Sequence, residues 1–165
     1  MNSKAKPFVK WVGGKGQLIE QLEQKLPADF DNWENATYIE SFVGGGAMLF
    51  YMLQQHPNIK RAVINDINSD LITCCRTVRD NVERLILSLR DIQAEYYALP
   101  DMEAKREMFM TVCQRYNEKN LDPLENTTKF FFLNRTCFNG LYRVNKKGLF
   151  NVPCGKYMQP QICVN

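Results

Sequence analysis

Histidine is almost missing from this 165-residue sequence, which contains only His56. A Ser-His-Asp triad or a multi-histidine metal site would depend on that one side chain. The six cysteines form no C-x-x-C pair and show no finger-like spacing. This argues against a zinc site or a disulfide framework and fits reduced thiols in a cytoplasm. We therefore predict no metal centre.

Long apolar runs are missing as well. No segment approaches the ~18 unbroken apolar residues of a membrane-spanning helix. The residues after Met1 lead into no apolar signal core. The sequence thus predicts no membrane partner and a cytoplasmic location. With 45% hydrophobic and 24% charged residues, the composition is that of a globular protein of ordinary domain size.

Acidic residues are missing from the last quarter of the chain. Residues 126–165 contain six basic side chains and no Asp or Glu, although the whole chain carries a net charge of only +3. The basic residues are interleaved with Phe138, Tyr142, Phe150 and Tyr157. This pattern favours contact with a polyanion such as nucleic acid. A solvated loop region that happens to lack acids is the alternative.

Strand and helix patterns alternate in the first half of the chain. Apolar runs at residues 37–43 and 61–65 are typical of buried strands, and helical spacing at 47–55 places a helix between them. Such a βαβ unit forms a parallel sheet with a right-handed crossover. Further elements are predicted as helices over residues 16–26, 68–89, 102–117 and from the Asp122 N-cap to about 134, and as a hairpin over 141–152.

Glycines are concentrated in two turns, at Gly13-Gly14 and at Gly44-Gly45-Gly46. Glycine lets the backbone approach a ligand closely because it has no Cβ atom. Asp66 follows the second turn by about 20 residues, the usual separation of an acid that binds a ribose hydroxyl. These features indicate a nucleoside-bearing cofactor. A plain tight turn is the alternative, but three consecutive glycines exceed what a turn requires.

The absence of two phosphate-binding motifs narrows the choice of cofactor. The second turn does not match G-x-G-x-x-G, and Gly13-Gly14-Lys15-Gly16 lacks both the upstream glycine and the Ser or Thr of a P-loop. A nucleoside without phosphates, such as S-adenosylmethionine, fits better. The Trp11 ring can face an adenine or sulfonium, and Lys15 can pair with the cofactor carboxylate. Core packing of Trp11 and an exposed Lys15 are the alternatives.

Five runs resemble, in order, the Dam-like DNA adenine-N6 methyltransferases. They read KWVGGK (10–15), ESFVGGG (40–46), NDIN (65–68), LNRTCFNGLYR (133–143) and GLFNVPCGKY (148–157). Phe138 departs from the commoner tyrosine of that family, and Ser41 departs from the commoner proline. The resemblance implies S-adenosylmethionine contacts at Trp11, Lys15, Glu40, Phe42, Gly44, Gly46 and Asp66. It implies DNA contacts at Lys10, Arg135, Phe138, Asn139, Leu141, Arg143, Asn151 and Pro153.

The resemblance also implies a fold of the α/β class. This is an incomplete Rossmann-like S-adenosylmethionine-dependent methyltransferase core, with an inserted helical and β-hairpin DNA-recognition domain. Residues 1–90 would form the first part of the core, and residues 91–165 the target-recognition domain. The implied activity is methyl transfer from S-adenosylmethionine to adenine N6 in double-stranded DNA, at a GATC-type or another site, in a host, phage or restriction system.

The D/N-P-P-Y/F turn of adenine-N6 methyltransferases is missing, because no two of the seven prolines are adjacent. In the family this turn lies C-terminal to the recognition domain and holds the target amine. We therefore expect a truncated chain that is inactive alone. The alternatives are a non-catalytic DNA- and cofactor-binding module, or half of a split enzyme whose catalytic part is a separate chain. A nucleotide-dependent oxidoreductase fits the βαβ unit but not the failed pyrophosphate motif.

Overall fold

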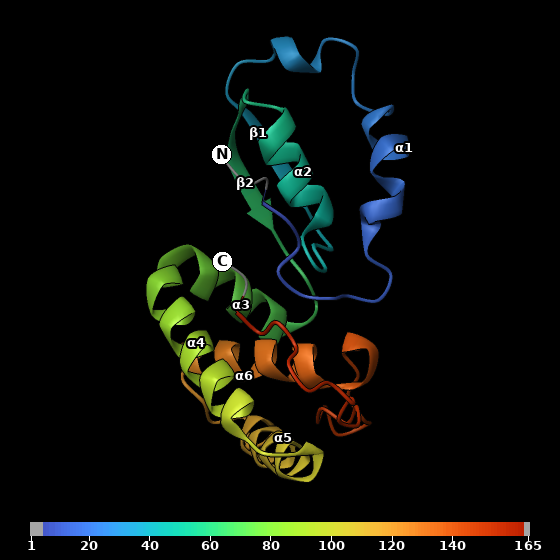
Figure 1. Ribbon diagram of the computed structural model, residues 1–165. Coiled ribbons are helices and arrows are strands. Elements are labelled where there is room, and N and C mark those ends of the chain that lie inside the picture. The colour runs from blue at the N-terminus through green and yellow to red at the C-terminus, as the bar shows by residue number, and fades with distance from the viewer. Residues whose placement is uncertain (1–4, 164–165) are drawn as a thin grey trace. The chain divides into compact units, whose positions relative to one another are not determined.

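The computed structural model describes residues 5–163 and divides into two compact units, the first ending at Asn68 and the second beginning at Ser69 (Figure 1). The predicted domains, 1–90 and 91–165, remain a prediction. The change of unit falls earlier because the helices that follow Asn68 pack on the last helix of the chain. Among the described residues, no helix is both long and apolar enough to cross a membrane.

The first unit contains the predicted βαβ arrangement. Strands β1 (Ala36–Glu40) and β2 (Ile59–Ile64) pair in parallel, and helix α2 (Ala47–Gln55) connects them. The small core joins Met48 and Met52 of α2 to Ile59, with Tyr38 packed against it. The opposite side chains of the strands, including the register pair Ile39 and Val63, are 67% and 40% exposed. One face of the sheet is thus packed and the other is open.

Two element predictions in this unit need correction. The helix expected over 16–26 is a 3-10 turn, η1 (Lys15–Leu18), followed by one short helix, α1 (Ile19–Glu23). No side chain caps either N-terminus, so the amide groups there have no local acceptor to start a longer helix. The strand expected over 37–43 ends at Glu40, because the chain then enters the glycine turn. A second 3-10 turn, η2, covers Phe30–Asn32.

The only histidine has a structural place. The His56 ring is buried edge-on against Phe30, and its Nδ1 lies 2.7 Å from Asp31 Oδ1. All six cysteines lie among the described residues and are free thiols.

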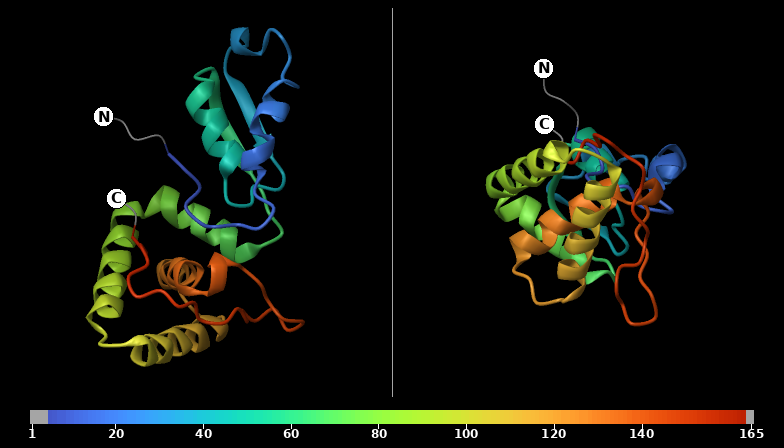
Figure 2. Two further views of the ribbon diagram at one scale, coloured as in Figure 1. Left: turned by 45° about the vertical axis from the view of Figure 1, so that its right-hand side comes forward. Right: turned by 60° about the horizontal axis from the view of Figure 1, so that its bottom comes forward.

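The second unit is helical: α3 (Ser69–Asp80), α4 (Val82–Ala98), α5 (Met102–Asn117) and α6 (Pro123–Thr136). Helix α6 packs against the other three, as the two views of Figure 2 show. Its Phe130–Leu133 stretch is buried all round, which is typical of a central helix. The predicted cap is confirmed, since the Asp122 carboxylate accepts hydrogen bonds from Leu124 N and Glu125 N at 2.9 and 3.1 Å.

The single helix expected over 68–89 is wrong, because it consists of two helices. Asn81 leaves the helical region with φ −141° and ψ 34° and becomes the N-cap of α4, a position that asparagine favours. Apolar spacing continues across this break, and so the pattern alone did not reveal it.

Lys105 is the least expected core residue. Its side chain is 1% exposed, and its ammonium group donates to Tyr96 O and Leu99 O at 2.6 and 2.9 Å. It also lies 4.8 Å from the centre of the Tyr96 ring. These carbonyls belong to the end of α4, where helix acceptors lack internal partners and favour a cation. Lys105, a residue of α5, therefore caps the carbonyl groups at the C-terminal end of α4.

After α6 the chain forms an irregular segment, the C-terminal loop (residues 137–155), which begins with a 3-10 turn, η3 (Phe138–Gly140). The predicted hairpin is present here as a single antiparallel bridge between Val144 and Phe150. Asn145 and Gly148 close its turn, with Gly148 N donating to Asn145 O at 2.9 Å. A second bridge, Cys137 with Cys154, joins the two ends of the loop.

Candidate cofactor cavity and DNA-contact loop

The loops that follow the two strands are fastened to each other. One oxygen of Asp66 accepts a hydrogen bond from Gly44 N at 3.0 Å, and the other accepts one from Asn68 N at 3.0 Å. Val43 N also donates to Asn65 O at 2.9 Å. The predicted pair of Gly44 and Asp66 is therefore brought together at the carboxyl end of the parallel sheet, where α/β proteins bind their ligands.

The glycine run is explained by close packing as well as by backbone angles. A Cβ atom on Gly44 would lie 3.2 Å from the Trp11 ring, and one on Gly45 would lie 3.2 Å from Trp11 Cβ. Gly44 and Gly46 also have positive φ angles of 53° and 81°, which glycine adopts without strain. Trp11 therefore packs on the glycine turn, and this contact fixes one wall of the site.

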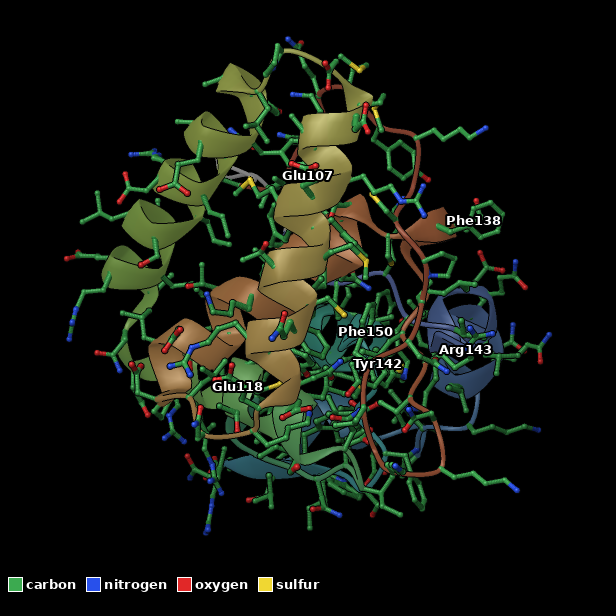
Figure 3. The ribbon with its side chains drawn as sticks, turned by 90° about the horizontal axis from the view of Figure 1, so that it is seen from below. Glu107, Glu118, Phe138, Tyr142, Arg143 and Phe150 are labelled. Atoms are coloured by element: carbon green, nitrogen blue, oxygen red, sulfur yellow. The ribbon has the colours of Figure 1, made fainter. Side chains whose placement is uncertain are left out.

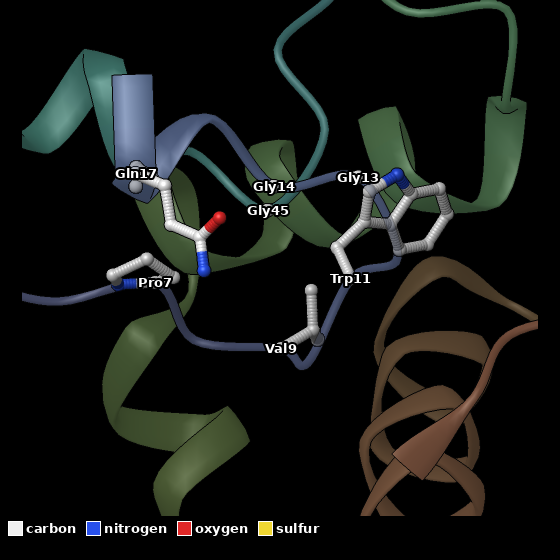
Figure 4. A pocket seen from close by; sticks show the side chains of 9 residues that line it. Pro7, Val9, Trp11, Gly13, Gly14, Gln17 and Gly45 are labelled. Atoms are coloured by element: carbon white, nitrogen blue, oxygen red, sulfur yellow. The ribbon is translucent and has the colours of Figure 1, made fainter. Parts of the chain in front are cut away.

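Five of the predicted cofactor residues line one cavity of about 220 Å³. They are Trp11, Lys15, Phe42, Gly44 and Asp66, and Val12, Gly13, Gly14, Val43, Gly45 and Ala47 complete the wall. Val43 and Gly45 belong to the glycine turn that was expected to line the pocket, whereas Val12 and Ala47 were not predicted, and their only sequence signal is their position beside glycines. Trp11 also lines a neighbouring cavity of about 470 Å³, where Figure 4 shows its indole beside Gly13 and opposite Pro7 and Gln17.

Glu40 and Gly46 are not in the wall of the 220 Å³ cavity, and Glu40 acts on it through Lys15. The Lys15 ammonium donates to Glu40 Oε1 at 2.9 Å and to the carbonyl of Phe42. Tyr38 donates to the other Glu40 oxygen at 2.9 Å. Burial raises the pKa of Tyr38, and the hydrogen bond and negative charge of Glu40 add to this. An ammonium has three N–H groups, so Lys15 can hold this network and still donate to a ligand carboxylate.

Gly44→Ala is expected to weaken binding of the predicted cofactor, S-adenosylmethionine, by at least about tenfold. Gly44 has a left-handed backbone conformation, and the new methyl group would push against the Trp11 ring. Isothermal titration of the variant measures the loss. Gly148→Ala is the matched control, since Gly148 has a similar φ of 74° but an open Cβ position outside this cavity. Equal affinities of the two variants would contradict the role given to the Trp11 contact.

The predicted DNA contacts lie mainly on the C-terminal loop. Arg143 donates through Nε and Nη2 to the side-chain and backbone oxygens of Asn151, at 2.9 and 3.0 Å. Phe138 N donates to Pro153 O at 2.9 Å, while the Phe138 ring is 53% exposed. Asn139 is exposed with φ 54°, an angle that asparagine tolerates better than most residues. Figure 3 shows Phe138 and Arg143 along this loop.

The remaining predicted DNA residues have different surroundings. Leu141 is partly buried in the same loop, and Lys10 is exposed in the first unit. Arg135 lies in the last turn of α6, where burial lowers the pKa of its guanidinium. Within residues 5–163, no group of three or more His, Cys, Asp or Glu side chains is arranged to hold a metal ion.

The family model of the D12 class N6 adenine-specific DNA methyltransferases matches residues 11–165. The chain therefore belongs to this family.

Among curated proteins, the chain is similar to the Type II methyltransferase M.MjaIII of Methanocaldococcus jannaschii, with 46% identity over 159 residues, 95% of this chain and 54% of that protein. It is 31% identical to the DNA adenine methylase of Escherichia coli (strain K12), over 95% of this chain and 50% of that protein. It is 35% identical to the DNA N-6-adenine-methyltransferase of Escherichia phage P1, over 92% of this chain and 18% of that protein. The chain spans about half the length of most of the curated relatives that it matches.

Proposed function

We propose that this chain supplies the S-adenosylmethionine- and DNA-binding parts of an enzyme that methylates adenine N6 in double-stranded DNA. The observation that carries the proposal is the convergence of Trp11, Lys15, Phe42, Gly44 and Asp66 on one cavity. Residues selected by sequence alone thus meet at the carboxyl end of the sheet. The names of the relatives support the reaction class.

The cavity residues fit the chemistry of S-adenosylmethionine. Each Asp66 oxygen accepts one backbone N–H and has lone-pair capacity for a ribose hydroxyl. The Trp11 ring offers a π face to adenine or to the sulfonium cation, and Lys15 offers a donor to the carboxylate. When bound, the cofactor supplies an electrophilic methyl group. The glycine turn would bring backbone amides close to it.

The predicted target-recognition domain, residues 91–165, would read DNA. Arg143 carries a fork of donors that suits a guanine edge. Phe138 and Asn139 are exposed side by side in the 3-10 turn η3, and such groups can fill a duplex from which the target adenine has been flipped. Proteins that act on chromosomal or phage DNA work where that DNA is, which agrees with the predicted cytoplasmic location.

The catalytic D/N-P-P-Y/F turn does not occur among the 165 residues, so we propose that it is supplied by further polypeptide, in the same protein or in a partner chain. The open sheet face supports this. Parallel sheets are covered on both faces in α/β proteins, whereas Ile39 and Val63 are exposed here. A non-catalytic binding module is the competing proposal.

The test is a methyl-transfer assay of the 165-residue chain with labelled S-adenosylmethionine and unmethylated duplex DNA, with binding of both followed in parallel. We expect binding of cofactor and DNA without transfer. Transfer would show that the catalytic acceptor is among these residues and was misread. Failure to bind either ligand by a folded chain would refute the proposed function. Transfer that appears when a D-P-P-Y-bearing partner is added would favour the split enzyme over the module.

A further inference from the structure

One carboxylate in the second unit collects three donors from two distant parts of the chain, the end of α5 and the C-terminal loop. Asp70, in the first turn of α3, accepts hydrogen bonds on Oδ2 from Tyr116, Lys119 and Tyr142, at 2.7, 2.8 and 3.2 Å. Its side chain is 19% exposed. This cluster could not be predicted from the sequence, because an acid in a first helical turn is common.

Tyr142 is held at its ring as well as at its hydroxyl. The ring lies 5.1 Å from Phe130 of α6 and 5.9 Å from Phe150, centre to centre, and Figure 3 shows Tyr142 and Phe150 side by side. Phe150 is fixed in turn by Asn117, whose side chain accepts from its N–H at 2.8 Å and donates to its carbonyl at 3.0 Å. The two sides of the hairpin are therefore both held against the helices, one through Tyr142 and the other through Phe150.

Tyr142 and Phe150, which we call the anchors of the loop, are each followed by a candidate DNA-contact residue. Arg143 follows Tyr142, and Asn151 follows Phe150; both are exposed and are bonded to each other. Neighbouring residues in an extended segment point to opposite sides. An anchor that faces the helices thus directs its neighbour away from them.

We propose that Asp70 is a positioning residue for DNA recognition, because it holds Tyr142 and so sets the place of the Arg143–Asn151 pair. The inference rests on the proposed function. It extends that function by assigning part of the sequence discrimination to a carboxylate that itself contacts no base.

The state of the Asp70 carboxyl agrees with this role. Burial by itself would raise its pKa, but the hydrogen bonds from Lys119 and Tyr116, the charge of Lys119 and the bond from Tyr142 together bring the pKa below its ordinary value. The group therefore stays ionised and accepts all three donors. Burial raises the pKa of Tyr116, and the neighbouring Tyr142 and Asp70 act in the same direction, so that this phenol remains a donor.

The test compares Asp70→Ala, Asp70→Asn and Tyr142→Phe with Asp80→Ala, a control at the exposed end of the same helix. Amide hydrogen exchange is measured in the free chain at Asn145, Gly148 and Asn151, which donate the hydrogen bonds of the loop. We expect exchange at these sites to rise by about tenfold in Asp70→Ala and Tyr142→Phe. Asp70→Asn should recover part of the protection, and Asp80→Ala should leave it unchanged.

The second measurement is the affinity for two duplexes, one selected from a randomised pool by the wild-type chain and one scrambled. We expect Asp70→Ala and Tyr142→Phe to lose about tenfold for the selected duplex and to keep their affinity for the scrambled one. Unchanged exchange, or opened exchange with unchanged discrimination, would overturn the positioning role. A wild-type chain that binds no duplex would refute the proposed function, while the exchange data would still decide whether Asp70 holds the loop.

Discussion

Asp66→Ala is expected to lower the affinity for S-adenosylmethionine by about 100-fold. The variant loses the acceptor proposed for the ribose and also the two bonds that hold Gly44 N and Asn68 N. Hydrogen bonds to a charged group contribute about 1.5–3 kcal/mol each, and about 3 kcal/mol corresponds to a change near 100-fold. Asp66→Asn keeps one carbonyl oxygen and should lose less.

Tryptophan fluorescence offers a direct readout of this effect. The chain has two tryptophans, and only Trp11 lines the cavity. A Trp33→Phe background therefore leaves a single reporter at the site. Glu34→Ala, at an exposed acid of the same unit, serves as the control for lost charge. A dissociation constant for Asp66→Ala within about threefold of the parent would show that Asp66 does not form part of the cofactor site.

Phe132→Ala is expected to lower the free energy of unfolding by about 4 kcal/mol, because it leaves a cavity in the centre of the helical unit. Phe132 is fully buried on α6 and packs edge-on against Tyr96 at 5.6 Å between ring centres. The matched change Phe138→Ala, six residues later, removes a ring that is 53% exposed. It should cost less than about 0.5 kcal/mol and act on DNA affinity instead.

Urea unfolding followed by circular dichroism measures this difference, because most helical residues belong to α3, α4, α5 and α6. Tryptophan fluorescence provides an internal control, since Trp11 and Trp33 both lie in the first unit. Equal stabilities of the two variants would contradict the central place of α6. A Phe138→Ala chain that binds DNA as tightly as the wild type would remove Phe138 from the proposed contacts.

Local sequence signals predicted structure correctly where a residue type has one dominant structural role. The Asp122 cap and the span of α2 followed from side-chain chemistry and periodicity. Gly44 and Asp66 were both assigned to the cofactor site, and the structure brings them into contact, while their cofactor role stays a prediction. Each of these depends on contacts within a few residues or on a motif of fixed spacing.

Long-range partners were not predictable in the same way. Nothing in the pattern links Lys15 to Glu40, Lys105 to the end of α4, or Asp70 to Tyr142. From the sequence, a single charged residue is expected to be a solvated side chain. Its partner becomes known only when the fold brings a distant donor or acceptor next to it. Asn81 ended a helix within an unbroken apolar pattern, because a helix pair that bends around α6 keeps its spacing on both sides of the bend.

The exposed face of the two-stranded sheet in the first unit affects how the chain is handled in a cell. Ile39 and Val63 lie opposite each other on a sheet of two strands, and each strand has an outer edge that is unpaired within the described residues. Apolar side chains beside free strand edges are what holdase chaperones and aggregating strands bind. A chain that leaves this face uncovered in a cell is therefore expected to be cleared by proteolysis.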